Sequence, residues 1–242
     1  PKLTLLLVAA FLCVVPAWHI SAQEPSRLPP LADGRHALKG GQSHSYLITL
    51  VAGQFFYALI EQQEIDITVS LYKPDGLLIS VSDSPNGRFG PEPALLVADV
   101  SGAYRIEVRA PNVRAAAASY QIKVVALREA TASDRQHVEA QRAFEEAQKL
   151  RSQSDATAKR AAIAKYQESI PGFQSSSDGY RQTLAVHASG VAYFDLNEQR
   201  NALRCFEEAL ALAQKVGDER LEAPIETFLG ASFETLGEIS KS

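Results

Sequence analysis

The spacing of hydrophobic positions changes near residue 130 of this 242-residue chain. Between residues 35 and 127, apolar and polar residues alternate in short runs, which is the period of strands that bury one face. Turn-forming residues such as Asp75-Gly76 separate the runs. The strand-like runs are SYLITLV, QFFYALIEQ, IDITVSLYK, LLISVSD, AYRIEVRA and SYQIKVVAL. They predict six to eight strands in an antiparallel β-sandwich of jelly-roll type.

From residue 130 the period becomes helical, and the composition shifts to Ala, Glu, Gln and Arg. Ser133 or Asp134 is expected to cap the first helix. Short polar breaks such as SQSDAT and SSSDG separate the helices. We predict five helices, at residues 133–152, 157–174, 178–196, 199–216 and 219–238.

The helical half repeats at a spacing of forty residues. NALRCFEEALALAQ (201–214) matches AAIAKYQESIPGFQ (161–174), small residue on small and large on large. The repeating unit is therefore a pair of helices that stacks on its neighbours, and the chain holds about two and a half such pairs. The residues that define the repeat are Ala162, Tyr166, Gly190, Tyr193, Ala202, Phe206, Ala209, Gly230 and Phe233.

The pattern Gly190-x-x-Tyr193, then Ala202-x-x-x-Phe206-x-x-Ala209, is similar to the tetratricopeptide repeat signature. The period of forty resembles that of the longer variants of this repeat. The predicted fold class is therefore multidomain β plus α, an antiparallel β-sandwich followed by an all-α tetratricopeptide solenoid over residues 130–242.

The first helix pair departs from the repeat signature, with Ser169 in place of Ala and Pro171 inside a helix, so it is interpreted as a degenerate copy. The resemblance implies a protein or peptide partner on the inner face, which the first helix of each pair lines. Val191 and Ala231 stand where a carboxylate clamp would need Asn. The lining is apolar to mildly acidic, which favours an extended or basic partner segment.

Residues 35–127 resemble the bacterial pre-peptidase C-terminal domain, a small β-sandwich attached to secreted proteins. The residues that carry the resemblance are Gly41, Tyr46, Leu50, Ala52-Gly53-Gln54, Pro74-Asp75-Gly76, Ser101-Gly102-Ala103-Tyr104 and Tyr120. It implies a non-catalytic accessory or binding module.

The start of the chain has the pattern of a secretory signal peptide. An apolar run at residues 3–18 is too short for a comfortable membrane span, and small Ala22 precedes a polar stretch. We predict a signal peptide over 1–22 and a Pro-rich linker over 23–34. The two alternatives are an uncleaved N-terminal anchor and a buried helix. The uncleaved anchor would be the one expected contact with a membrane. The expected location is periplasmic or extracellular.

The order of these parts resembles the N-terminal region of exported bacterial tetratricopeptide proteins that often end in a caspase-like (CHAT) peptidase domain. The chain contains no Met, begins at Pro1 and ends within a repeat, so we expect a fragment, with further repeats or an effector domain beyond residue 242. The first hypothesis is a non-catalytic protein-interaction scaffold or sensor region that positions or regulates a downstream effector domain. The alternatives are the regulatory half of a CHAT cysteine peptidase and a cell-envelope or glycan-binding module.

Charge excludes one class of partner. Residues 23–128 carry ten basic and ten acidic side chains, whereas residues 129–242 carry thirteen basic and eighteen acidic ones. A nucleic-acid surface needs a basic stripe, so nucleic acid is not an expected partner.

Candidate chemistry is sparse. Cys205 and His187 lie on adjacent predicted helices, and a Cys–His pair can act as nucleophile and base. Cys205 is next to core residue Phe206, however, and a buried free cysteine is the preferred interpretation. The acidic pairs Glu145-Glu146 and Glu207-Glu208 are interpreted as solvated helix faces.

No metal, cofactor or catalytic residue is assigned. The aspartates of the sandwich have no spacing of a calcium loop, and its two histidines lack a third ligand nearby. We interpret these histidines as solvated. The residues considered are Asp66, Asp75, Asp83, Asp99, His36 and His44.

Overall fold

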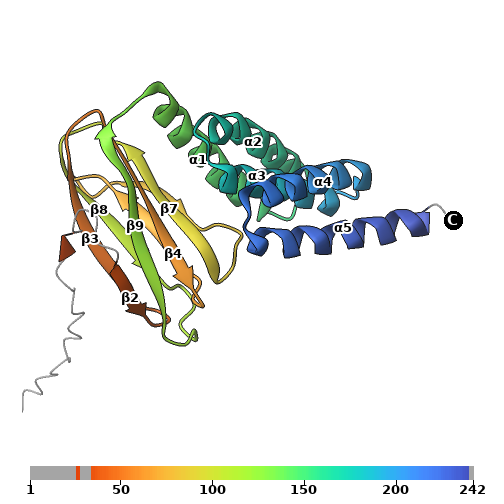
Figure 1. The fold of residues 1–242 in the computed structure, drawn as a ribbon, viewed down its shortest axis with the longest axis horizontal. Helices are drawn as coiled ribbons and strands as arrows, with labels where there is room; N and C mark the ends of the chain where they lie inside the picture. The colour runs from red at the N-terminus through yellow and green to blue at the C-terminus, as the bar shows by residue number, and fades with distance from the viewer. Residues whose placement is uncertain (1–25, 28–33, 240–242) are drawn as a thin grey trace, which may run out of the picture.

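A computed structural model describes residues 26–27 and 34–239 of the protein. The predicted signal peptide and most of the predicted linker lie outside the described residues. The described chain forms two β-sheets that face each other, followed by five helices that extend away from them (Figure 1).

The sheets confirm the predicted antiparallel sandwich. One has the order β1-β3-β8-β5-β6 and the other the order β2-β9-β4-β7, and every neighbouring pair is antiparallel except the short β1 with β3. The strands are β1 (Ser26–Arg27), β2 (Gly34–Leu38), β3 (Ser43–Leu50), β4 (Gln54–Gln63), β5 (Thr68–Tyr72), β6 (Leu78–Ser82), β7 (Phe89–Val97), β8 (Gly102–Arg109) and β9 (Ala118–Glu129).

The sandwich core lies between the two sheets. Alternate residues of β8 point inward, and Tyr104, Ile106 and Val108 are almost wholly buried, as the alternation predicts. On β9, Tyr120 and Ile122 are buried in the same core. The Asp75-Gly76 turn is also as predicted, because Asp75 Oδ1 accepts from the main-chain N of the second residue after it, 3.0 Å away.

The helices are α1 (Ala132–Arg151), α2 (Ala156–Ser175), α3 (Gly179–Asp195), α4 (Gln199–Val216) and α5 (Glu219–Ile239). Their ends lie within one residue of the predicted ends. The cap of α1 differs from the prediction: Thr131 is the N-cap residue, and Asp134 completes a capping box with it. Within the described residues, no helix combines the length and apolar content needed to cross a membrane.

Strand β7 is absent from the sequence prediction because it does not alternate. Ala94 and Leu96 pack in the sandwich core, while Leu95 packs on the opposite face against Val138 of α1. A strand covered on both faces reads as a continuous apolar run, and two prolines further weaken its strand pattern. It lies at the edge of its sheet, which is where prolines are tolerated.

Glycine allows close helix packing at two positions, of which only Gly190 belongs to the forty-residue repeat. A Cβ added to Gly190 of α3 would lie 2.6 Å from Cε1 of Phe206 on α4. Gly172 has the same role between α2 and α1, since its Cβ would lie 2.6 Å from that of Ala140. Apart from the nearby backbone of α5 itself and the two neighbouring residues, no described atom lies within 4 Å of a Cβ built at Gly230.

Candidate binding cleft between the sandwich and the helices

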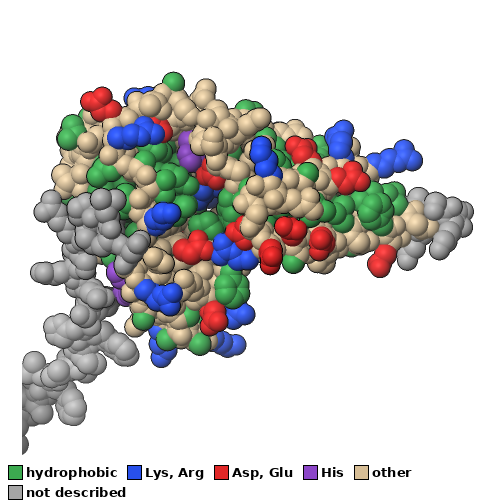
Figure 2. All heavy atoms as spheres, viewed as in Figure 1, with side chains coloured by type: hydrophobic (Ala, Val, Ile, Leu, Met, Phe, Trp, Pro, Cys, Tyr) green, Lys and Arg blue, Asp and Glu red, His purple; other side chains and the backbone are tan. Residues whose placement is uncertain are grey.

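The outer face of the four-stranded sheet packs on α1. Phe55 of β4 and Leu95 of β7 form a small apolar cluster with Val138. This contact covers part of the surface of α1, a first helix of the repeat. Figure 2 shows acidic and basic side chains gathered where the sandwich meets the helices, and one such pair joins Arg220 of α5 to Glu61 of β4 at 2.6 Å.

A cleft of about 1070 Å³ opens beside this contact. One wall comes from β4 and β9, and the other from the ends of α1, α2, α3 and α4. Aromatic, small apolar, hydroxyl and amide groups line it, together with the basic residues Arg128 and Lys215 and the carboxylates of Asp134 and Asp178. Arg128 forms an ion pair with Asp134. Representative lining residues are Phe55, Tyr57, Arg128, Ser175, Gln182 and Lys215.

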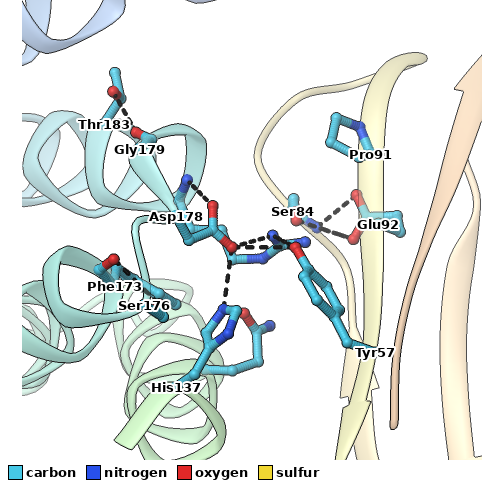
Figure 3. Close-up of polar contacts among 12 residues, drawn as sticks. Tyr57, Ser84, Pro91, Glu92, His137, Phe173, Ser176, Asp178, Gly179 and Thr183 are labelled. Atoms are coloured by element: carbon cyan, nitrogen blue, oxygen red, sulfur yellow. Dashed lines mark hydrogen bonds and ion pairs between the residues drawn. The ribbon is translucent and has the colours of Figure 1, made fainter. Parts of the chain in front are cut away.

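Asp178, the N-cap residue of α3, joins three structural elements beside the cleft (Figure 3). Its Oδ1 accepts from the main-chain N of Arg181 at 3.0 Å. Its Oδ2 accepts from Nη1 of Arg181 at 2.7 Å, from Nε2 of His137 on α1 at 3.1 Å and from the hydroxyl of Tyr57 on β4 at 3.2 Å. Arg181 Nη1 also donates to Tyr57 Oη at 3.0 Å.

This network is buried, and burial changes how its members titrate. Burial by itself would raise the pKa of Asp178, but the charge of Arg181 and the hydrogen bond from His137 hold that pKa well below its usual range. Arg181 is 2% exposed, and the neighbouring carboxylate keeps its pKa above the usual value despite burial. Burial raises the pKa of Tyr57 to about 12. Asp178 and Arg181 are therefore both ionised over the physiological pH range.

Two buried glutamates lie around the same arginine. Burial raises the pKa of Glu92 on β7 to about 8, although hydrogen bonds from Ser84 and the charge of Arg181 lower it. Burial also raises the pKa of Glu145 on α1, whose Oε1 accepts from the hydroxyl of Ser82 at 2.8 Å. The prediction that Glu145 is solvated is therefore wrong, because β6 covers this part of α1.

The arrangement offers no activated nucleophile among the described residues. His137 bonds only to Asp178, with no Ser, Thr or Cys group bonded to the ring. In the Cys205–His187 pair, burial raises the pKa of the thiol to about 11 and lowers the pKa of the imidazole to about 4. The described structure has no hydrogen bond between the two, and a protonated thiol is a weak nucleophile.

The two sandwich histidines were predicted to be solvated, but the structure makes them only partly exposed. His44 Nδ1 lies 2.7 Å from the hydroxyl of Tyr120, His36 stacks on the Tyr120 ring, and both histidines are partly buried. Tyr46 completes this aromatic cluster through a hydrogen bond to Tyr120. These rings come from β2 and β9 of one sheet and from β3 of the other. No group of three metal-ligating side chains exists within the described residues.

The nine repeat-defining residues lie apart from the cleft, and none of them lines it. Five are 0% exposed in the helical core: Ala162, Tyr166, Ala202, Phe206 and Ala209. Tyr193 packs against that core and Gly190 contacts α4, whereas Phe233 is 56% exposed.

Sequence reasoning missed Asp178 and Arg181 as a buried pair. The only local signal was Arg181 following a capping Asp at the start of an apolar helix.

No protein-family model and no curated protein matches the chain. Among solved structures, Aeromonas hydrophila PliG, a periplasmic inhibitor of g-type lysozyme, matches 38% of this chain and 84% of its own at 17% identity and a TM-score of 0.31. The pre-peptidase C-terminal domain of Bacillus anthracis collagenase matches 42% and 94% at 17% identity and 0.34. Salmonella Typhimurium PliG matches 41% and 95% at 20% identity and 0.30. Likenesses at these values carry no argument about function.

Proposed function

We propose that this region is a non-catalytic protein-interaction scaffold, and that it binds an extended peptide segment in the cleft between the sandwich and the helices. The observation that carries the proposal is the cleft itself. It has the size of a ligand site, about 1070 Å³, and its lining includes the partly exposed rings of Tyr57 and Tyr180. Hydroxyl and amide groups at the helix ends can form hydrogen bonds with the main-chain N–H and C=O groups of a peptide.

The buried ion network supports this role by holding the cleft walls together. Asp178 and Arg181 belong to α3, whereas Tyr57 belongs to β4, and their bonds fix the sandwich to the helices. A cleft between two walls binds tightly only when ordering the walls costs little free energy.

The helical half is proposed to be a tetratricopeptide-type solenoid. The forty-residue spacing and the close approach of Gly190 to Phe206 support this reading. The proposed export rests on the signal-like residues 1–22, and a CHAT peptidase beyond residue 242 rests on the resemblance alone. The glycan alternative is not favoured, because Phe89 is the one exposed aromatic residue on the described part of the sandwich.

Selection of peptides on the intact chain tests the cleft. Twelve-residue peptides from a random display library would be selected on the immobilised protein, and their Kd measured by fluorescence anisotropy. Gln182→Trp fills the cleft, whereas Gln214→Trp adds the same ring to an exposed position of α4 outside it. We expect at least a tenfold loss of affinity in the first variant and none in the second.

Equal affinities in the two variants would place the peptide site elsewhere and refute the cleft as the binding site. Cleavage of the selected peptides by the purified chain, at a rate above that of buffer, would refute the non-catalytic assignment.

A further inference from the structure

One edge of the sandwich is left unprotected. On the side next to the helices, the two sheets end in β7 and β6. Strand β7 carries Pro91 and Pro93, which cannot donate main-chain hydrogen bonds, and α1 packs on its outer face. Strand β6 contains neither proline nor a charged residue. Natural sheets usually protect their edges with such residues, so β6 lacks these two protections, although it is short and α1 lies beside it.

The outer side of β6 has no strand partner among the described residues, because β6 pairs only with β5. Its main-chain donors and acceptors on that side are therefore available to another extended chain. Large apolar side chains at its start are exposed, Leu77 by 61% and Leu78 by 55%. These features are those of a site for strand addition.

A groove of about 240 Å³ runs between β6 and α1, and it shares no lining residue with the cleft. Four charged residues of α1 line it. Glu145 bonds to Ser82 and Glu146 pairs with Lys165 at 3.1 Å. The other two, Arg142 and Lys149, form no ion pair with any described residue. Arg142 and Lys149 are therefore the two charged groove residues whose side chains have neither an ion pair nor a hydrogen bond among the described residues, whereas Glu145 has hydrogen bonds but no ion pair.

We propose that the free edge of β6 binds an extended peptide segment, which adds as a further strand and places acidic side chains opposite Arg142 and Lys149. Main-chain hydrogen bonds to β6 supply the pairing, and the charges select the acidic sequence. A second copy of this chain fits less well. Pairing β6 with β6 across a two-fold axis would bring a second Arg142 and Lys149 to the same region.

The test uses two fluorescein-labelled peptides of eight residues on the intact chain, one alternating Val and Glu, the other Val and Lys. We expect the Val–Glu peptide to bind at least tenfold more tightly, and its affinity to fall as salt is raised. Ser80→Lys places a charge on the free edge and should abolish binding. Ser43→Lys, on exposed β3 between β1 and β8, is the matched control and should not change it.

Two further arms separate strand pairing from general attraction. N-methylation of alternate amides of the Val–Glu peptide should abolish binding when the methyl groups face β6, and leave it intact when they face solvent. This arm holds even if Ser80→Lys fails to fold. A double change, Arg142→Glu with Lys149→Glu, should reverse the preference between the two peptides.

The proposal is overturned if neither peptide binds, or if both patterns of N-methylation weaken binding equally. It is also overturned if the two lysine variants lose equal affinity. A dimer seen by sedimentation of the protein alone, and dissociated by Ser80→Lys, would assign the edge to a second copy and so reject the peptide.

Discussion

Replacing Glu92 with Gln should stabilise the protein at alkaline pH and have little effect in acid. The Glu92 side chain is 0% exposed, and its two oxygens accept from the main-chain N of Ser84 at 3.0 and 2.9 Å. Its pKa is raised by burial to about 8 from an ordinary value of 4.5. The carboxyl is therefore mostly neutral at pH 7, and Gln reproduces its shape and its acceptor without a titrating group.

The sign and size follow from the shift. A folded-state pKa above the unfolded one means that stability is fully present below pH 4.5 and is lost as pH rises through 8. A shift of about 3.5 units corresponds to about 5 kcal/mol between these limits, at about 1.4 kcal/mol per unit. Of the charged groups that act on Glu92, Arg181 lowers its pKa and Asp83 raises it. Glu92→Gln has no titrating group at this position, so it removes the loss of folding stability that Glu92 causes as pH rises through 8.

Urea unfolding followed by circular dichroism at pH 5, 7 and 9 measures the effect. At pH 5 we expect the variant to lie within about 1 kcal/mol of the natural protein, since a neutral carboxyl and an amide make comparable hydrogen bonds. At pH 9 it should be more stable by several kcal/mol. Glu139→Gln, on the exposed face of α1, is the control, with a difference that does not change over this range.

A difference that is equal at pH 5 and 9 would refute the reasoning. A loss of stability in Glu92→Gln that grows with pH would mean that Glu92 is ionised and serves as a second ion-pair partner of Arg181.

Three further predictions concern the junction, the helix contacts and the cysteine. Arg181→Met should cost about 3 to 5 kcal/mol in urea unfolding, because Asp178 would remain as a buried unpaired charge, and adding Asp178→Asn should restore part of it. Gly190→Val should lower the melting temperature, whereas Gly230→Ala should raise stability by about 0.5 to 1 kcal/mol, because an added Cβ clashes only at the first position. The rate of iodoacetamide labelling of Cys205, measured by mass spectrometry, should rise with pH up to about 11 and stay slow at pH 8; rapid labelling at pH 8 would contradict this.

Local periodicity predicted most elements, and two of the misses, strand β7 and the environment of Glu145, have a common cause. Strand β7 was missed because α1 covers the face that an isolated sandwich would expose to water. Glu145 was assigned to solvent for the same reason, since Ser82 of β6 lies against it. In both places the local pattern is that of one half of the molecule, and the environment is set by the other half.

The candidate site depended on the tertiary structure to a greater degree. Its apolar wall could be read as strand residues, but nothing in the neighbourhood of Tyr57 indicates a carboxylate partner 121 positions later in the chain. His137 and Asp178 are likewise 41 residues apart. Charged residues on predicted helices are normally solvated, and that interpretation is correct for the exposed Glu207 and Glu208 in the middle of α4.

The sequence by itself determined the change from strands to helices near residue 130, the inward faces of β8 and β9, and the forty-residue register of the helix pairs. These features follow from periods of two and of 3.6 residues, which each segment carries in its own side chains. Only the tertiary structure decided that Arg181, Asp178 and Glu92 are buried. It also placed the cleft beside the first half of α1 and the edge of β6 beside the second half. Burial of a charge depends on what packs over it. Arg181 of the helices and Glu92 of the sandwich are more than eighty residues apart in the chain, so neither local sequence indicates the other.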